Sequence, residues 1–98
     1  MIDVRLTATG QRLEVAPSQP RIIRGTRNML RLCVSFSTEW DGMAVAAVFR
    51  NGDAVPLEGG RCMVPNELCD RMSVHVRLVG KRGAEVYTTC WAAVRQGE

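Results

Sequence analysis

The segment FSTEWDG, Phe36 to Gly42, joins two strand-like stretches and decides the fold that we predict for this chain. Before it, residues 30–36 alternate apolar and polar side chains, the period expected of a strand with one buried face. After it, residues 43–49 are apolar throughout, which indicates a strand covered on both faces. Trp40 offers a large apolar surface, and the Asp-Gly pair that follows it supplies turn chemistry. We therefore expect Trp40 to be a buried anchor between two core strands.

Hairpins are predicted at both ends of the chain. Residues 2–8 and 12–15 alternate around a Thr-Gly-Gln turn, which is typical of two paired strands. Residues 73–78 alternate in the same way, and a Gly-Lys-Arg-Gly turn leads into a last strand over 85–95. Both faces of this last strand carry apolar side chains, so we expect both to be at least partly covered.

The middle of the chain predicts a further hairpin and one helical turn. Asn51-Gly52 is the strongest hairpin signal, because a type I′ turn needs positive φ at both central residues, so Phe49 and Val55 are expected on paired strands. After the glycines at 59–60, residues 62–64 are expected to complete a three-stranded meander. Residues 65–71 are the one helix candidate, since proline suits a first helical turn.

Eight or nine short strands with regular turn signals and almost no helix define the fold class. This pattern is typical of an all-β antiparallel sandwich or a small barrel. We favour the sandwich, Ig-like or jelly-roll-like with one short helical turn, because the strands are short and unequal. Residues 1–98 are expected to form a single domain, since 98 residues can bury an adequate core.

Charge and hydropathy exclude several classes of protein. The net charge is +3, from 13 basic and 10 acidic residues, which is a mild excess and not the dense basic stripe of a nucleic-acid binder. No stretch reaches the roughly 18 to 20 apolar residues of a membrane span. The first five residues alternate and do not resemble a signal peptide. We therefore expect a soluble protein that is made in the cytoplasm and binds neither membrane nor nucleic acid.

The four cysteines, Cys33, Cys62, Cys69 and Cys90, are widely spaced and form no CxxC pair. Zinc sites and thioredoxin-like redox sites use such pairs. Because thiols stay reduced in the cytoplasm, we expect four free cysteines that act mainly as apolar filler. No metal and no cofactor is predicted.

No catalytic constellation is found either. His75 is the single histidine, and it lies on the polar side of its strand without a nucleophile in a recognised setting. The carboxylates are dispersed among turns and strand faces, so the sequence pairs no acid with a base. We therefore predict that the protein is not an enzyme.

Four arginines, Arg21, Arg24, Arg27 and Arg31, lie close together in sequence. Their guanidinium groups suit carboxylates on a partner, which makes them a candidate docking surface. A solvated strand edge protected by charge is the simpler explanation of these arginines. The N-terminal strand over residues 2–8 is the second candidate docking region, because an edge strand can pair with another chain.

A resemblance adds to these patterns. It rests on these residues: Thr26-x-Asn28-x-Leu30, Phe36-Ser37-x-Glu39-Trp40-Asp41-Gly42, Ala47-x-Phe49, Cys62-x-Val64-Pro65-x-Glu67, Gly80 and Thr88-Thr89. Together they resemble the small β-sandwich module of virion proteins of tailed bacteriophages and prophages, often the N-terminal part of fibre or baseplate-type proteins. The structural motif of this resemblance comprises Phe36, Trp40, Asp41, Gly42, Phe49 and Pro65.

The resemblance implies a non-enzymatic structural protein located in the virion. Its partners would be capsid, tail or fibre subunits, and we expect a homo-oligomer, of which a trimer is one form. The chain differs from longer members because no collagen-like or receptor-binding extension follows Gln96-Gly97-Glu98. This difference favours a stand-alone role such as capsid decoration.

A ligand-binding module of carbohydrate-binding or adhesin type is the alternative function. Such a module would line a shallow groove with exposed aromatic rings. The positions of Trp40 and Trp91 discriminate between the two, because buried rings favour the structural protein and exposed rings in a groove favour the ligand-binding module.

Overall fold

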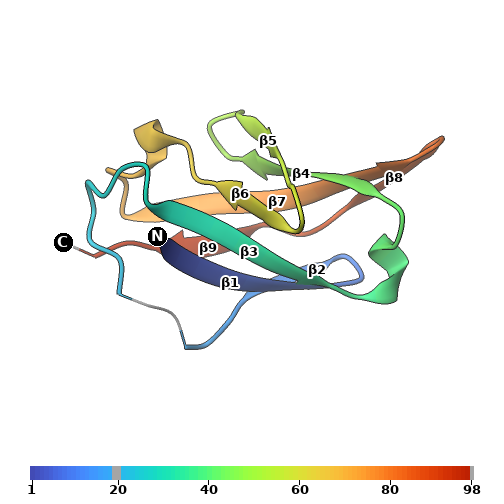
Figure 1. The fold of residues 1–98 in the computed structure, drawn as a ribbon, viewed down its shortest axis with the longest axis horizontal. Coiled ribbons are helices and arrows are strands. Elements are labelled where there is room, and N and C mark those ends of the chain that lie inside the picture. The colour runs from blue at the N-terminus through green and yellow to red at the C-terminus, as the bar shows by residue number, and fades with distance from the viewer. Residues whose placement is uncertain (19–20, 98) are drawn as a thin grey trace.

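Two β-sheets pack face to face and enclose an apolar core between them (Figure 1). The computed structural model describes residues 1–18 and 21–97. The first sheet has the order β2 (Arg12–Val15), β1 (Ile2–Thr9), β3 (Leu30–Phe36) and β6 (Arg61–Met63). The second has the order β5 (Ala54–Pro56), β4 (Ala44–Phe49) and β7 (Ser73–Arg82), with β8 (Glu85–Thr88) and β9 (Ala92–Arg95) both paired to β7. The predicted all-β sandwich is confirmed.

The core comes from the inward face of each sheet. In β1 the side chains of Val4, Leu6 and Ala8 are buried, and the residues between them point outward, as the alternation predicts. In β7 the buried positions also alternate, from Val74 to Gly80. The long side chains that meet between the sheets include Leu32 and Phe49, both fully buried.

One strand pair departs from the antiparallel arrangement that we predicted. β1 and β3 run parallel, with a register from Ile2 opposite Leu30 to Ala8 opposite Phe36. The hairpin partner β2 occupies one side of β1, so β3 joins the other side. β1 is therefore an interior strand, and the prediction that residues 2–8 form a free edge for docking is wrong. The connection between β2 and β3 is long enough to carry the chain back before β3 begins, as parallel neighbours require.

The predicted meander of three consecutive strands is wrong at its third strand. β4 and β5 pair as expected, although the turn between them is not the predicted type I′, because Gly52 has a positive φ and Asn51 does not. β6, in contrast, crosses to the other sheet and pairs with β3. At the crossing Gly60 lies close to β3, and its carbonyl accepts a hydrogen bond from the Val34 N–H at 2.8 Å. A Cβ at Gly60 would lie 2.8 Å from the Val34 carbonyl oxygen, which is too close for any side chain.

The predicted last strand over 85–95 is two strands, and its inward face changes between them. Tyr87 and Thr89 point inward before the break, and Ala92 and Val94 point inward after it. The Thr89 hydroxyl accepts the Leu78 N–H at 2.9 Å and so takes the place of a backbone carbonyl in the ladder. The chain bulges at Cys90, whose own N–H bonds to the Gln11 carbonyl in the β1–β2 turn.

Helical structure is confined, in the described residues, to two 3-10 turns. η2 (Asn66–Leu68) lies in the segment where a helical turn was predicted. η1 (Thr38–Trp40) was predicted only as a turn, and it carries the chain from β3 in one sheet to β4 in the other. No helix in this part of the chain has the length and hydropathy needed to cross a membrane.

Candidate functional site: the outer face of the five-stranded sheet

The structural motif around Trp40 forms a plug at one end of the sandwich. Trp40 is 3% exposed, and its Nε1–H donates to the Gly10 carbonyl at 2.8 Å. Its ring lies 5.5 Å from the ring of Phe36 and 4.9 Å, edge-on, from that of Tyr87. Gly80 of β7 lies against the indole with no side chain between them. These contacts make Trp40 a structural residue and remove it from any binding surface.

The other motif residues are structural as well. Gly42 has φ of 76°, a left-handed conformation that favours glycine, and the Asp41 carbonyl accepts a hydrogen bond from Arg82 at 2.6 Å. Phe49 is fully buried in the core. Pro65 precedes η2, and its carbonyl accepts the Leu68 N–H.

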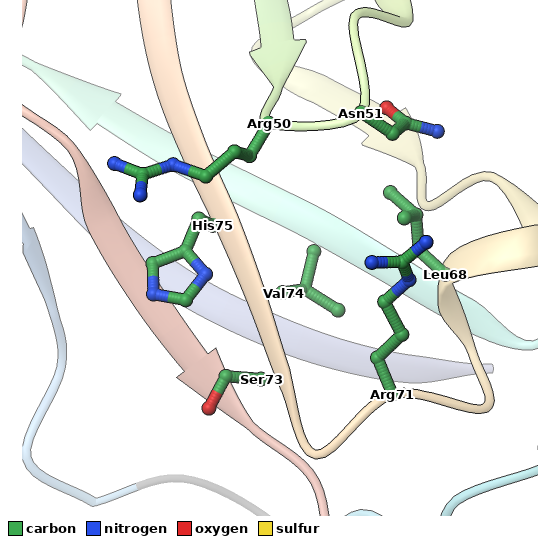
Figure 2. A pocket seen from close by; sticks show the side chains of 7 residues that line it. All are labelled: Arg50, Asn51, Leu68, Arg71, Ser73, Val74 and His75. Carbon is green, nitrogen blue, oxygen red and sulfur yellow. The ribbon is translucent and has the colours of Figure 1, made fainter.

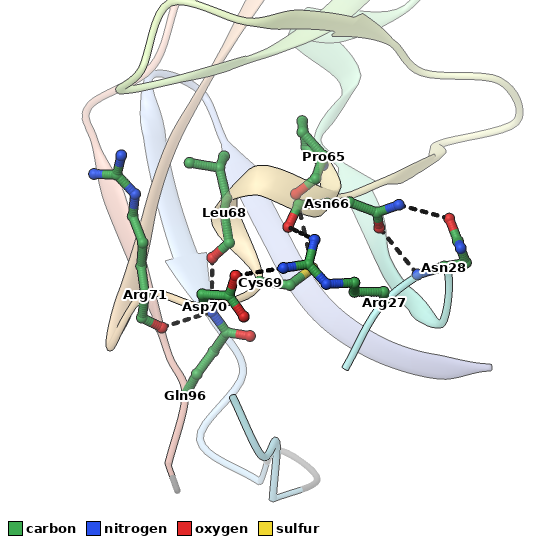
Figure 3. Close-up of polar contacts among 9 residues, drawn as sticks. All are labelled: Arg27, Asn28, Pro65, Asn66, Leu68, Cys69, Asp70, Arg71 and Gln96. Atoms are coloured by element: carbon green, nitrogen blue, oxygen red, sulfur yellow. Dashed lines mark hydrogen bonds and ion pairs between the residues drawn. The ribbon is translucent and has the colours of Figure 1, made fainter. Parts of the chain in front are cut away.

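Two of the four arginines in the candidate docking surface already pair with carboxylates of the same chain. Arg27 pairs with Asp70 and also donates to the Asn66 carbonyl at 3.2 Å (Figure 3). Arg31 forms a two-pronged ion pair with Asp3, with Nε–Oδ1 at 2.8 Å and Nη2–Oδ2 at 3.0 Å. The hydrogen bond from Arg31 is the main cause that lowers the pKa of Asp3.

The remaining two arginines of that set, Arg21 and Arg24, are exposed, and no carboxylate of the described residues pairs with them. The backbone N–H of Arg24 donates a hydrogen bond to the Gly97 carbonyl, so the segment around Arg24 runs beside the end of the described chain. Docking through the arginines stays a prediction, with two of the four side chains already engaged.

A small pocket beside β7 contains the single histidine. It has a volume of about 140 Å³ and is lined by His75, Ser73, Arg50, Arg71 and Asn51, with Leu68 and Val74 at its base. Figure 2 shows Arg50 and His75 on one side of Val74 and Arg71 on the other, so the basic groups do not converge on one point. No cluster of His, Cys, Asp or Glu that could hold a metal ion occurs in residues 1–18 and 21–97.

The outward side chains of the five-stranded sheet form the most distinctive surface, which we call the outer face. They alternate with the buried positions of each strand: Ala44, Ala46, Val48, Ala54, Pro56, Ser73, His75, Arg77, Val79, Lys81, Val86, Thr88, Ala93 and Arg95, with Arg50 and Trp91 beside them. Small apolar side chains of β4, β5 and β7 line a shallow depression of about 330 Å³ in this face. In this face the side chains of Val48 and Val79 are half-buried, and that of Val86 is exposed.

The outer face also carries charge of one sign. Arg50, Arg77, Lys81 and Arg95 are cationic, and no aspartate or glutamate occupies an outward position of the described strands of this sheet. The opposite face of the sandwich differs, because it carries carboxylates and each of them pairs with an arginine: Asp3 with Arg31, and Glu14 with Arg12 at 3.3 Å. The two faces therefore present different chemistry.

Trp91 lies among the cations of the outer face. Its side chain is 36% exposed, and the guanidinium carbons of Arg50 and Arg77 lie over its ring at 4.8 and 4.9 Å from the centroid. Among the described residues, neither guanidinium has a carboxylate partner, and the buried Nε of Arg77 has no hydrogen-bond partner. The stacking on Trp91 holds both groups in place.

The sequence contained a signal for this face that we interpreted differently. Residues 43–49 are apolar at every position, and we expected a strand covered on both faces or crossed closely by another element. That expectation is wrong, because Ala47 and Phe49 are buried while Ala44 is exposed and Ala46 and Val48 are half-buried at the surface. Apolar residues on both sides of a strand indicate either a covered strand or a binding surface, and periodicity alone does not separate these cases.

Comparisons with known protein families, with characterised proteins and with solved structures find no match to this chain.

Proposed function

We propose that this protein is a non-enzymatic structural module of a bacteriophage virion, which attaches to a capsid or tail component through the outer face of its five-stranded sheet. The observation that carries the proposal is this face itself, which combines uncovered apolar side chains with unpaired arginines and a tryptophan. Tryptophan and arginine are the residues most enriched at the energetic centres of protein interfaces. The resemblance of the Phe36–Gly42 segment to virion modules supports placing the interface on a phage particle.

The carbohydrate-binding alternative has less support. A sugar stacks on an open aromatic ring in a groove, whereas Trp40 is buried and two guanidinium groups lie over the ring of Trp91. The pocket at His75 has a volume of about 140 Å³, which is below the usual range for an organic ligand. The depression of about 330 Å³ in the outer face is large enough, but its lining residues include no aromatic ring on which a sugar could stack.

Incorporation into particles tests the proposed function. The double variant Val48→Asp/Val79→Asp places two carboxylates in the apolar part of the outer face without touching the core. Thr7→Asp/Ser35→Asp is the matched control, because these residues are register partners that point outward on the opposite sheet and receive the same change in charge.

We expect particles from a genome that encodes the chain to contain the control at the parental level and to lack the Val48→Asp/Val79→Asp variant. Mass spectrometry of purified particles measures the amount, and circular dichroism shows that both variants fold. Absence of the parental protein from the particles contradicts a virion role, and normal incorporation of both variants removes the outer face from the attachment surface.

A further inference from the structure

We propose that the partner of the outer face is a protein surface with an apolar centre and a rim of carboxylates, and that Arg50 and Arg77, held on Trp91, receive those carboxylates. This inference deepens the proposed function and rests on it. It assigns a chemistry to the partner that attachment alone does not require.

The charges of the outer face indicate a partner with acidic groups. Its four cations have no acidic neighbour at the outward positions of the described strands, whereas the opposite face carries two carboxylates, Asp3 and Glu14, each paired with an arginine. A face with charge of one sign attracts a complementary face and repels a similar one. Two copies of this chain placed face to face would bring eight cations together, so the occupant is not a second copy in that arrangement.

The geometry of Arg50 and Arg77 suits them to bind carboxylates. Each guanidinium lies less than 5 Å from the centroid of the Trp91 ring, and this stacking fixes its position while leaving N–H donors for another molecule. A carboxylate accepts two parallel hydrogen bonds from such a group. The arrangement therefore presents preorganised donors beside an apolar surface.

The apolar part of the face selects a protein over a nucleic acid. Val48 and Val79 belong to a depression lined mostly by alanine, valine and proline side chains. A sugar–phosphate backbone offers no apolar surface to cover them, and single-stranded nucleic acid would require a row of open aromatic rings. A protein partner supplies aliphatic side chains for the depression and carboxylates for the arginines in one surface.

Binding of designed peptides to the intact 98-residue chain tests the inference. The first probe is an amphipathic helical peptide with a stripe of leucines flanked by glutamates, and the second replaces every glutamate by lysine. A single-stranded oligonucleotide is the third probe. Chemical-shift changes of backbone amides locate the binding surface, and titration gives the dissociation constant at low and physiological salt.

Two double variants separate the arginines. Arg50→Gln/Arg77→Gln removes both charges beside Trp91, and Arg21→Gln/Arg24→Gln removes two exposed charges from the other candidate surface. We expect the glutamate peptide to shift amides of β4, β7 and β9 and to bind the first variant at least tenfold more weakly, with a smaller dependence on salt. The control variant should bind within twofold of the parent, and Arg50→Lys/Arg77→Lys should recover part of the affinity.

Four results would overturn the inference: equal binding of the lysine peptide, tighter binding of the oligonucleotide, loss of binding in the control variant only, or dimerisation through this face in sedimentation equilibrium. The particle assay separates this inference from the proposed function. If Arg50→Gln/Arg77→Gln is incorporated normally while Val48→Asp/Val79→Asp is lost, attachment through the face stands and the acidic rim is wrong.

Discussion

Gly80 lies against Trp40 at a distance that leaves no room for a side chain. A Cβ at this position would meet Cζ3 of the indole at 2.8 Å and the Met43 sulfur at 2.9 Å. We predict that Gly80→Ala lowers the free energy of unfolding by about 1 to 3 kcal/mol, the usual cost of overpacking. Urea denaturation monitored by circular dichroism measures this change.

The same experiment includes a second substitution that identifies the cause. Trp40→Phe removes the outer ring of the indole, which contains Cζ3, so Gly80→Ala should cost less in that background than in the parent. An equal cost in both backgrounds would show that the alanine acts through Met43 or the backbone and not through Trp40.

The ion pair of Asp3 on the surface of the first sheet should make the stability of the fold depend on pH. Its hydrogen bonds from Arg31 lower its pKa, so the ion pair contributes stability above the pKa of an unfolded aspartate, about 3.9, and loses it as the pH falls through the lower folded value. We predict that Asp3→Asn lowers the urea midpoint at pH 7 and that the difference from the parent shrinks and disappears as the pH falls below the lowered pKa of Asp3. A constant difference across this range would contradict the assignment.

The four thiols differ in their access to solvent and in their ionisation. Burial raises the pKa of Cys62 to about 11, and burial also raises that of Cys69, while Cys90 is exposed. Because the thiolate is the reactive form, roughly one Cys62 in a thousand is reactive at pH 8 even where reagent can enter.

We therefore predict that iodoacetamide modifies Cys90 of the folded protein first and Cys62 last. Four adducts should form after unfolding without reductant, because the structure contains four free cysteines. Mass spectrometry of timed samples follows the order, and two missing adducts after unfolding would reveal a disulfide.

At the scale of the element, Thr89 controls the break between β8 and β9. Its hydroxyl accepts the Leu78 N–H at 2.9 Å inside the protein. We predict that Thr89→Val, which keeps the shape and removes the acceptor, costs about 1 to 3 kcal/mol because it leaves that N–H buried and unpaired. Thr88→Val is the control on the neighbouring residue, which points outward, and it should change the urea midpoint little.

The strands that alternation predicts are found where one face is buried and the other is in water. The pattern from Ile2 to Ala8 places three core residues correctly, and Asn51-Gly52 gives the β4–β5 hairpin. Strand partners were harder to predict, because periodicity describes the faces of a strand and not its neighbours. The pairing of β6 with β3 depends on the approach of Gly60 to Val34, which is a tertiary contact.

The candidate site was predictable only in part, for a similar reason. The sequence shows that Trp40 and Trp91 matter, but it does not show that one fills the core and the other lies under two guanidinium groups. Arg50 and Arg77 are 27 residues apart in the numbering, and β4 and β7 bring them to one ring. The predicted docking surface used arginines that are close in sequence instead, and two of these, Arg27 and Arg31, have carboxylate partners within the chain.

At the scale of the whole molecule, the sandwich is asymmetric from one side to the other. The first sheet presents paired charges and hydroxyl groups to solvent, and the second presents the outer face. Under the proposed attachment the outer face is the side that contacts the partner, and contacts within a homo-oligomer would use the other side or the edges. The proposed attachment therefore leaves the first sheet pointing away from the partner.

The crossing of β6 between the sheets also links the unfolding of one sheet to that of the other. The chain enters the second sheet with β4 and β5, returns to the first with β6, and then re-enters the second with β7. Neither sheet is thus a continuous piece of chain that could separate and survive alone, and we expect a single all-or-none transition. The Trp91→Phe variant reports the fluorescence of Trp40 in the core, and the Trp40→Phe variant reports that of Trp91 on the outer face. In each variant the unfolding transition followed by fluorescence should coincide with the transition followed by circular dichroism. A fluorescence change that precedes the loss of β-structure would mean that one end of the sandwich melts independently.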